Sequence, residues 1–305
     1  MRSKRIVVSG YATLDYVVQL SGPFHGTGTV TGELGLSGAW PRAGGAALYA
    51  SRRIAAAGHR AFPLTWIGDD GDGGHYLRAC QRAQICRDAI DQRGGAKTPR
   101  CILLYRPDGD YGCLLDTGFE GRETLTDGQI DVAAAADHVC IAAGPPGPTA
   151  DLLDACSPAT GVSWIAKLDP VSYPPGLRAR LAQRAGLIFC NASEREFIES
   201  VREGKRPEDQ IIVETLGSAG VLIDCRHGRR VIPTAPLRTH DTTGAGDTLA
   251  GEVIAQYIAG QMAIEAAVEH GMAAARSLLV SRIPGSIGTG CVPAAHPLID
   301  RQENE

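Results

Sequence analysis

The most informative stretch of this 305-residue chain is Asp241-Thr242-Thr243-Gly244-Ala245-Gly246-Asp247, which leads into an apolar run over residues 248–258. Its small residues predict a turn with bare backbone N–H groups that enters a helix directly. Glycines let the backbone approach a ligand closely, and the N–H groups at a helix start form an anion site with the helix dipole. Asp and Thr also favour helix caps, but a cap does not explain two glycines between two aspartates. We therefore expect an anion-binding turn that holds the carboxylate of Asp247.

This motif resembles the C-terminal signature of the ribokinase (PfkB) family of ATP-dependent sugar and nucleoside kinases. In that family the GAG backbone forms an anion hole for the transferring phosphoryl group, and the final Asp deprotonates the substrate hydroxyl. The resemblance assigns the hole to Gly244, Ala245 and Gly246, and the base to Asp247. Phosphoryl transfer requires stabilised charge on the phosphoryl oxygens and a base that orients the hydroxyl. A turn rich in backbone donors with one carboxylate supplies both.

Composition indicates an ordinary soluble enzyme. The chain is 44% hydrophobic and 21% charged, and its net charge of −4 with no basic stripe argues against a nucleic-acid-binding surface. No signal peptide or membrane-spanning run is visible, so we expect no membrane association. The nine cysteines are scattered without a CxxC pair. This pattern predicts a cytoplasmic protein without disulfides or structural zinc.

Apolar runs typical of strands alternate with periodic stretches typical of helices. This alternation predicts an α/β domain with a mostly parallel central sheet and helices on both faces. The resemblance makes it a ribokinase-like three-layer α/β/α core. We expect strands at residues 5–9, 61–67, 138–142, 163–168, 186–190, 210–214, 220–224 and 229–232, the last two forming a hairpin, and helices at 46–57, 75–83, 149–156, 193–201, 245–259 and 262–280.

Two segments do not follow this alternation. Residues 11–38 hold Gly- and Thr-rich strand-like pieces, and residues 100–116 hold two short strands about a turn. Together they predict a small β-sheet that projects from the core, so we expect one domain over residues 1–305 with an inserted lid. Relatives carry such a lid over the substrate, and in many it is also the dimer contact. The resemblance therefore implies a homodimer through the lid.

Substrate-binding candidates lie in the N-terminal part of the chain. Gly44-Gly45 matches the family's glycine pair, which lets the backbone touch substrate hydroxyls. Asp15 matches the acidic residue that accepts hydrogen bonds from those hydroxyls, although Asp is also common in turns. Where ribokinase has an Asn that contacts the sugar, this chain has Tyr49. A tyrosine can stack on a ring face, donate one hydrogen bond or simply pack under the lid. The departure argues against ribose and resembles inositol-kinase-like members.

Nucleotide-binding candidates follow two later strands. Asn191-Ala192-Ser193-Glu194 resembles the family's N-x-x-E motif, whose Glu helps to hold Mg²⁺ through its water shell. The same letters predict a helix cap with Asn at the N-cap and Glu at N3, and both roles are compatible. The segment 215–220 resembles a T-x-G-x-x-G motif that lines the phosphates of ATP, which singles out Thr215, Gly217 and Gly220. Without the resemblance it would be a tight turn.

Two further sites depend on the resemblance alone. His270 lies where ribokinase-like proteins place a residue near adenine, although a lone His on a helix is more often a surface or core residue. Asp241, Thr243 and the loop 281–288 occupy positions that bind a monovalent cation such as K⁺ in many relatives, mostly through backbone carbonyls. Gly68-Asp69-Asp70, similar to the family's G-D-D segment, is expected to shape a turn.

The sequence thus predicts an ATP-dependent phosphotransferase that acts on a hydroxyl of a sugar or polyol, with Asp247 as general base. One alternative is a nucleoside kinase, in which Tyr49 or a lid aromatic would stack on a base. The other is a non-catalytic sensor that binds a sugar or nucleotide. The intact GAG turn and Asp247 argue against the sensor, because a pure binder has no need of a base in an anion hole.

Overall fold

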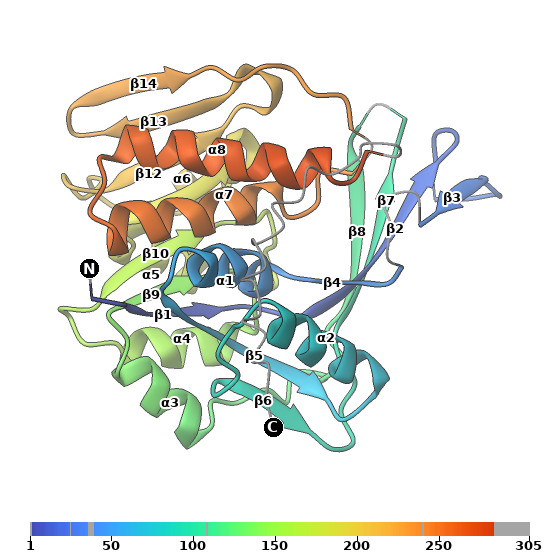
Figure 1. Ribbon diagram of the computed structural model, residues 1–305, viewed down its shortest axis with the longest axis horizontal. Helices are drawn as coiled ribbons and strands as arrows, with labels where there is room; N and C mark the ends of the chain where they lie inside the picture. The colour runs from blue at the N-terminus through green and yellow to red at the C-terminus, as the bar shows by residue number, and fades with distance from the viewer. Residues whose placement is uncertain (1, 25, 36–39, 108, 240, 284–305) are drawn as a thin grey trace, which may run out of the picture.

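The computed structural model describes residues 2–24, 26–35, 40–107, 109–239 and 241–283. Within these ranges the largest element is a nine-stranded sheet in the order β14-β13-β12-β11-β10-β9-β1-β5-β6 (Figure 1). Strands from β12 to β6 run parallel to their neighbours, and β13 and β14 form the expected hairpin at one edge. The strands are β1 (Arg5–Ser9), β5 (Arg60–Gly68), β6 (Ile90–Arg93), β9 (His138–Ile141), β10 (Gly161–Ile165), β11 (Leu187–Asn191), β12 (Ile211–Thr215), β13 (Val221–Cys225) and β14 (Gly228–Ile232).

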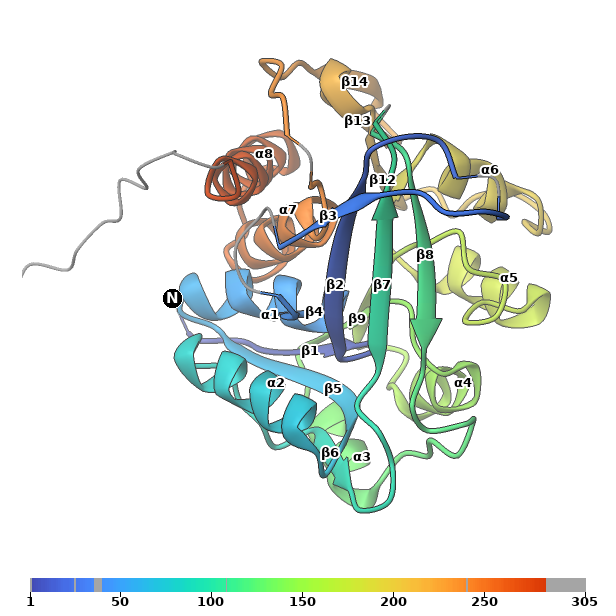
Figure 2. The same cartoon turned by 90° about the vertical axis from the view of Figure 1, so that its right-hand side faces the viewer.

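Helices cover both faces of this sheet, which confirms the predicted three-layer α/β/α architecture (Figure 2). One layer contains α1 (Ala46–Ala56), α2 (Gly71–Arg82), α7 (Ala245–Val253) with a π-helical continuation (Ile254–Ala259), and α8 (Ile264–Val280). The other contains α3 (Asp127–Ala134), α4 (Pro146–Ala155), α5 (Pro175–Arg184) and α6 (Ala192–Glu199). None of the helices in the described ranges is long and apolar enough to cross a bilayer.

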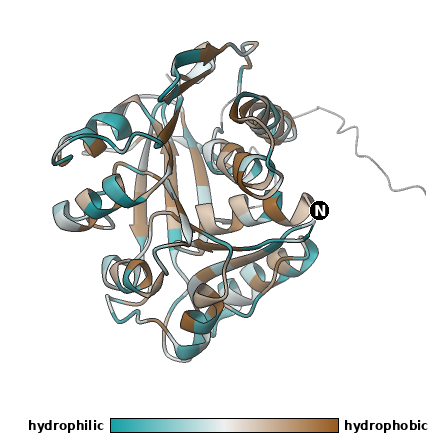
Figure 3. Ribbon diagram, turned by 90° about the vertical axis from the view of Figure 1, so that its left-hand side faces the viewer, coloured by the Kyte–Doolittle hydropathy of each residue, from teal (hydrophilic) through white to brown (hydrophobic). Residues whose placement is uncertain are grey.

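The parallel strands are apolar on both faces because both are buried. In β1, Ile6 and Val8 join the apolar cluster beneath α1, α7 and α8, whereas Val7 joins the cluster beneath α4 and α5. Each such buried side chain stabilises the fold by about 1.5–3 kcal/mol relative to exposure. Figure 3 shows brown strands in the interior and teal on the outer parts of the helices. The core therefore lies in two layers, one on each side of the sheet.

Helix α7, which begins with the GAG turn, is held by backbone contact with both of its neighbours. A Cβ added at Gly251 would lie 2.5 Å from the Cα of Ala50 on α1. A Cβ added at Gly271 on α8 would lie 2.9 Å from the carbonyl oxygen of Leu249. Real Cβ atoms do not approach so closely, so glycine is needed at both contacts. The position of α7 is thereby fixed relative to α1 and α8.

A second, mixed sheet stands beside the main one, with strand order β3-β2-β7-β8 and β4 paired to β2 (Figures 1 and 2). Strand β2 pairs in parallel with β7 and antiparallel with β3 and β4. Two distant parts of the chain therefore build this sheet. Its strands are β2 (Thr13–Leu20), β3 (Gly32–Leu34), β4 (Arg42–Gly44), β7 (Arg100–Tyr105) and β8 (Tyr111–Asp116).

Three elements were not predicted from the sequence, and one strand was predicted too far along the chain. Helix α5 has few apolar positions among its arginines, and α3 is short with little apolar periodicity. Strand β6, at the edge of the sheet, has the polar sequence Ile-Asp-Gln-Arg and therefore lacks the apolar run of a buried strand. The strand expected at 163–168 was wrong at both ends, because β10 begins at Gly161 and stops at Ile165. Lys167 consequently lies in the turn beyond the strand.

The turn expected at residues 68–70 is confirmed. Asp70 caps α2 by accepting the N–H of Gly73 at 2.8 Å. Its carboxylate also accepts the N–H and hydroxyl of Thr98 at 3.0 and 2.6 Å. These bonds lower the pKa of Asp70 against the opposing effect of burial, which is the largest contribution. Asp70 is therefore a structural residue that joins α2 to the segment before β7.

Candidate active site

The candidate residues gather at the carboxyl ends of the parallel strands. Strand β1 lies between β5 and β9, so the direction in which successive strands are added to the sheet reverses at β1. Ligands of open α/β sheets bind at such a switch point, beyond the carboxyl ends of the strands. Lys167 follows β10, Asn191 ends β11 and Thr215 ends β12. This edge therefore carries groups from three neighbouring strands.

The GAG turn begins α7 with Gly244 as N-cap in the left-handed conformation, φ 74°. The N–H of Ala245 donates to the carbonyl of Thr242 at 3.1 Å. No side chain of the described residues caps this helix start. The N–H groups of Gly246 and Asp247 are consequently available to a ligand. A Cβ at Gly246 would meet nothing within 4 Å, so the turn is open on that side.

Asp247, in the first turn of α7, is buried and paired with a cation. It is 6% exposed, and its Oδ1 lies 3.2 Å from Nζ of Lys167. The contact lacks hydrogen-bond geometry, so Oδ1 can still accept a hydrogen bond. Asp247 is the largest cause of the raised pKa of Lys167, with Glu194 and Tyr111 adding to it. Lys167 is therefore a charged ammonium beside the carboxylate.

Glu194 belongs to the same charged group. It is 8% exposed and forms a capping box with Asn191, in which its Oε2 accepts the Asn191 N–H at 2.7 Å and Asn191 Oδ1 accepts the Glu194 N–H at 2.9 Å. Burial raises the pKa of Glu194, Lys167 lowers it and Asp247 raises it. The fold thus brings Asp247 and Glu194 into one electrostatic environment, with Lys167 acting on both.

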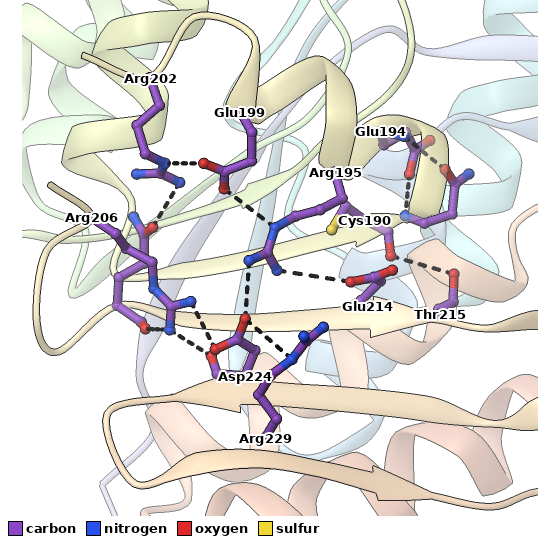
Figure 4. Close-up of polar contacts among 12 residues, drawn as sticks. Cys190, Glu194, Arg195, Glu199, Arg202, Arg206, Glu214, Thr215, Asp224 and Arg229 are labelled. Carbon is purple, nitrogen blue, oxygen red and sulfur yellow. Dashed lines mark hydrogen bonds and ion pairs between the residues drawn. The ribbon is translucent and has the colours of Figure 1, made fainter. Parts of the chain in front are cut away.

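A network of arginines holds α6 against the sheet next to this site (Figure 4). Arg195 lies 3.0 Å from Asp224 on β13 and 3.8 Å from Glu214 on β12. Arg206 contacts the same Asp224 carboxylate at 2.8 Å. Together they lower the pKa of Asp224, although burial opposes this. The network fixes the start of α6, and therefore the Asn191–Glu194 capping box, relative to β12.

Asp15 lies on β2, where the second sheet meets the core. It is 3% exposed and accepts the hydroxyl of Thr13 at 2.6 Å. A Cβ at Gly44, on the facing strand β4, would overlap its carboxylate, so glycine is needed there. Burial raises the pKa of Asp15 to about 6, and Asp247 contributes to the rise. Asp15, Gly44 and Asp247 are therefore close neighbours in the fold.

Tyr49 supports the GAG turn from α1. It is 3% exposed, and a Cβ at Gly244 would lie 2.6–2.7 Å from its ring carbons. Its hydroxyl accepts a hydrogen bond from Nη2 of Arg282 at 3.0 Å. This burial favours the packing alternative for Tyr49 over stacking on a substrate. Glycine at 244 is thus needed both for its backbone angle and to make room for the ring.

The second sheet touches the motif directly. The hydroxyl of Tyr105 on β7 lies 2.9 Å from the hydroxyl of Thr243 and 3.3 Å from that of Thr242. Its ring stacks on Tyr111 of β8 with centroids 5.0 Å apart. Tyr111 is 51% exposed and also acts electrostatically on Lys167. The two tyrosines therefore line the site from the side of the second sheet.

The other sequence candidates have mixed surroundings. A Cβ at Gly45 would overlap the carbonyl of Tyr11, and one at Gly220 the carbonyl of Ile232. Space around Gly217 is open. His270 is exposed on α8, the helix that packs on α7. Thr215 is half-buried, and its hydroxyl donates to the carbonyl of Cys190 at 3.4 Å.

The residues present are compatible with Mg²⁺ held through water. The described part of the chain has no cluster of three His, Cys, Asp or Glu side chains placed to bind a metal. Mg²⁺ keeps several waters and needs only one or two carboxylates beside substrate phosphates. Glu194 and Asp247 provide such carboxylates at the strand ends.

Sequence reasoning missed Lys167, Arg42 and Arg282. Arg42 Nη1 donates to Asp241 Oδ2 at 2.8 Å, and Arg282 reaches the same carboxylate from the other end of the chain. These contacts join residues far apart in sequence, so no local pattern marks them. Lys167 carried one usable signal, because a lysine interrupting an apolar strand is unusual.

Two alanine substitutions should separate structural from chemical demands on the turn. Gly244→Ala should destabilise the protein by about 2 kcal/mol or more, through its left-handed backbone and overlap with Tyr49. Gly246→Ala faces open space, so it should unfold at the wild-type temperature. If the turn holds a transferring phosphoryl group, as the sequence resemblance implies, the same change should lower kcat about tenfold or more. Thermal unfolding and steady-state kinetics measure both. A stable Gly244→Ala protein, or a fully active Gly246→Ala protein, contradicts these assignments.

Comparison with known families gives one clear match. A family model described as "pfkB family carbohydrate kinase" matches residues 36–283. The chain is 24% identical over 219 residues to ribokinase of Mus musculus, a match that spans 66% of this chain and 67% of that protein. It is 26% identical over 204 residues to an ATP-dependent ribose-1-phosphate kinase of Halopiger xanaduensis, spanning 63% of this chain and 65% of that protein.

Solved structures show the same fold. A nucleoside kinase of Methanocaldococcus jannaschii is 18% identical and covers 91% of this chain and 93% of its own, with a TM-score of 0.73. A ribokinase of Cryptococcus neoformans in complex with ADP is 21% identical and covers 91% of this chain and 92% of its own, also with a TM-score of 0.73. At these identities the likeness is one of fold.

Proposed function

This chain belongs to the pfkB family of carbohydrate kinases, and from that membership we propose that it transfers the γ-phosphoryl group of ATP to a hydroxyl of a sugar or polyol. The observation that carries the proposal is the position of Asp247. Its carboxylate is buried in the first turn of an uncapped helix, beside open space over Gly246 and next to an ammonium group. A base, backbone donors and a cation thus converge at one point.

In this proposal the acceptor alcohol lies between two carboxylates. Asp15 accepts hydrogen bonds from neighbouring substrate hydroxyls, which orients the sugar. Asp247 accepts the proton of the attacking hydroxyl at Oδ1. The GAG backbone of residues 244–246, continued by the N–H of Asp247, receives the charge that develops on the phosphoryl oxygens. Lys167 would turn its ammonium from Asp247 toward the transferring group, where it offsets the negative charge of the phosphoryl oxygens and the charge that passes to the leaving oxygen of ADP as that bond breaks.

ATP would lie over the ends of β11 and β12. Thr215, Gly217 and Gly220 would face its phosphates, with Asn191 beside them and His270 nearer the base. Glu194 would hold Mg²⁺ through water, and Mg²⁺ would neutralise charge on the phosphates of the nucleotide. The rigid attachment of α6 through Arg195 supports this role, since a nucleotide site requires a fixed backbone.

We further propose that the second sheet is a lid and a dimer contact. Leu34, Ile102 and Leu114 are 57%, 41% and 60% exposed on this sheet, and Ile102 and Leu114 are direct cross-strand partners. Exposed apolar patches of this kind mark interaction sites. A second copy of the chain would cover them. Sedimentation would show a dimer, and Leu114→Glu should shift it toward the monomer.

Asp15 should impose a pH dependence on sugar binding. Its pKa is raised to about 6, so the ionised form that accepts two hydroxyls is lost as the pH falls through about 6 rather than near 4. We expect kcat/KM for the sugar to fall about tenfold per pH unit below that point. Asp15→Asn should raise KM by about 10–100-fold, from the loss of charge-assisted hydrogen bonds, and remove this pH dependence. An unchanged acid limb in Asp15→Asn would assign the titration to another group.

One observation favours a nucleoside as an alternative acceptor. Tyr111 is half-exposed beside Lys167 and stacks on Tyr105. An aromatic platform in the lid could hold a base by stacking. Sugars and polyols remain the preferred class because Asp15 and Asp247 provide acceptors for several hydroxyls.

A substrate panel tests the proposal. ADP release with Mg-ATP should be measured for sugars, polyols and nucleosides, with thermal shifts for the same compounds. Turnover of a sugar or polyol supports the proposal, and turnover of nucleosides alone supports the alternative. Tight binding of a sugar without turnover of any compound would indicate a sensor.

A further inference from the structure

Arg282 lies just beyond the end of α8 and reaches into the motif. It is 7% exposed. Its Nη1 lies 3.3 Å from Oδ1 of Asp241 and donates a hydrogen bond to the carbonyl of Thr243, while Nη2 donates to the hydroxyl of Tyr49 at 3.0 Å. One guanidinium thus contacts Asp241 and Thr243 of the motif and also donates a hydrogen bond to Tyr49, the tyrosine that packs on Gly244.

The carboxylate that Arg282 contacts is already compensated in charge. Asp241 is 3% exposed, and Arg42 Nη1 lies 2.8 Å from its other oxygen. The N–H of Thr243 donates to Oδ1 at 2.9 Å. Burial raises the pKa of Asp241, but Arg282 and Arg42 overcome this and lower it. Two positive charges therefore neutralise one buried carboxylate.

These residues do not suit a potassium ion. The sequence resemblance assigned a monovalent cation to Asp241, Thr243 and the loop 281–288, mostly through backbone carbonyls. The carbonyl of Thr243 accepts a hydrogen bond from Arg282, and the carboxylate of Asp241 lies against the same guanidinium. An ion on these oxygens would place a third positive charge on one carboxylate. It would also need to displace a buried guanidinium. Residues 284–288 of the assigned loop lie outside the described residues.

We propose that the guanidinium of Arg282 takes the place of a monovalent cation in this chain, so that phosphoryl transfer does not depend on K⁺. The proposal rests on the kinase function proposed above. Arg282 is a positioning residue, because it acts on the anion hole through Thr243 and through the ring of Tyr49 against Gly244. Arginine suits this position because its planar fork bonds two groups at once and keeps its charge when buried.

The wild-type protein gives the first test. Initial rates and the thermal midpoint are measured in KCl and in tetramethylammonium chloride at equal ionic strength. We expect rates within about twofold and equal midpoints, since a ligand that binds only the folded state would raise the midpoint. A saturable stimulation of rate by K⁺, or a K⁺-specific rise in midpoint, overturns the proposal. The midpoint is informative even if no substrate is found, so failure of the kinase assignment is distinguishable.

Variants give the second test. Arg282→Met should lower kcat about 10–100-fold with little change in KM. Losses of this size are usual for residues that hold the groups contacting a ligand without contacting the ligand themselves. K⁺ should raise both its rate and its midpoint, because the oxygens of Asp241 and Thr243 are then free of the guanidinium. Arg282→Lys retains a cation and should stay insensitive to K⁺. Arg276→Met is the matched control, because Arg276 lies in the last turns of α8 and also donates to a backbone carbonyl, that of Ala235.

An Arg282→Met protein that folds, loses activity and ignores K⁺ would contradict the replacement. If Arg282→Met does not fold, Arg282→Lys and the wild-type salt series decide the question. A K⁺ requirement in either protein rejects the proposal.

Discussion

Asp247→Asn is expected to lower kcat by about 10²–10⁴-fold, the usual contribution of a positioned general base. Asn has almost the same shape as Asp, but it cannot take the proton of the attacking hydroxyl. The substitution leaves unchanged the helix start, the open side of Gly246 and the residues at the ends of β11 and β12 to which we assign the nucleotide. Affinity for ATP should therefore change little.

ADP release measures the rate, and binding of a non-hydrolysable ATP analogue measures the affinity. Asp154→Asn is a suitable control, because Asp154 is an exposed carboxylate on α4 that also pairs with a cation, Arg180. It should behave as wild type. If Asp247→Asn keeps more than about a tenth of wild-type kcat, Asp247 is not the base.

Lys167→Gln is expected to lower kcat by about 10²–10³-fold, comparable to the loss of one oxyanion-hole donor. Its ammonium lies 3.2 Å from Asp247 and acts on Glu194, so it stands between the base and the nucleotide end of the site. The substitution removes the charge and keeps a hydrogen-bonding side chain. KM for the sugar should be nearly unchanged, because Lys167 does not contact Asp15 in our proposal.

Nucleotide affinities distinguish this role from a structural one. The ATP analogue should lose affinity in Lys167→Gln while ADP does not, because only the third phosphate meets the ammonium. Lys167→Arg should recover part of the rate. Lys4→Gln, which removes a surface lysine paired with Asp137, should have no effect. A kcat within about threefold of wild type, or equal losses for ADP and the ATP analogue, would make Lys167 a structural partner of Asp247.

The features that were predictable from the sequence are local ones. Buried parallel strands are nearly continuous apolar runs, so β1, β5 and β11 were found with errors of one residue or less at each end. The GAG turn was recognisable from the sequence because one short segment holds both the glycines and the carboxylate. The capping box at Asn191 was foreseen for the same reason.

The features that were missed depend on tertiary contacts. Arg42 and Arg282 converge on Asp241 of the motif from positions about 200 and 40 residues away. An arginine on the surface and one against a buried carboxylate look the same in a sequence. Lys167 was missed because an apolar run does not show at which residue its strand ends. That position decides whether the lysine lies within the sheet or beyond its carboxyl edge, next to Asp247.

The glycine contacts of α7 bear on how this enzyme's preference could be redesigned. A helix whose backbone touches α1 at Gly251 and α8 at Gly271 cannot slide without breaking both contacts. Mutations there would disturb the machinery common to every acceptor. The second sheet contacts the motif through Tyr105 on β7 and Arg42 on β4, and it carries Asp15 on β2. Its exposed positions, such as Tyr111, are the ones open to variation. Libraries aimed at a new acceptor alcohol therefore belong in β2, β7 and β8, with α7 left untouched.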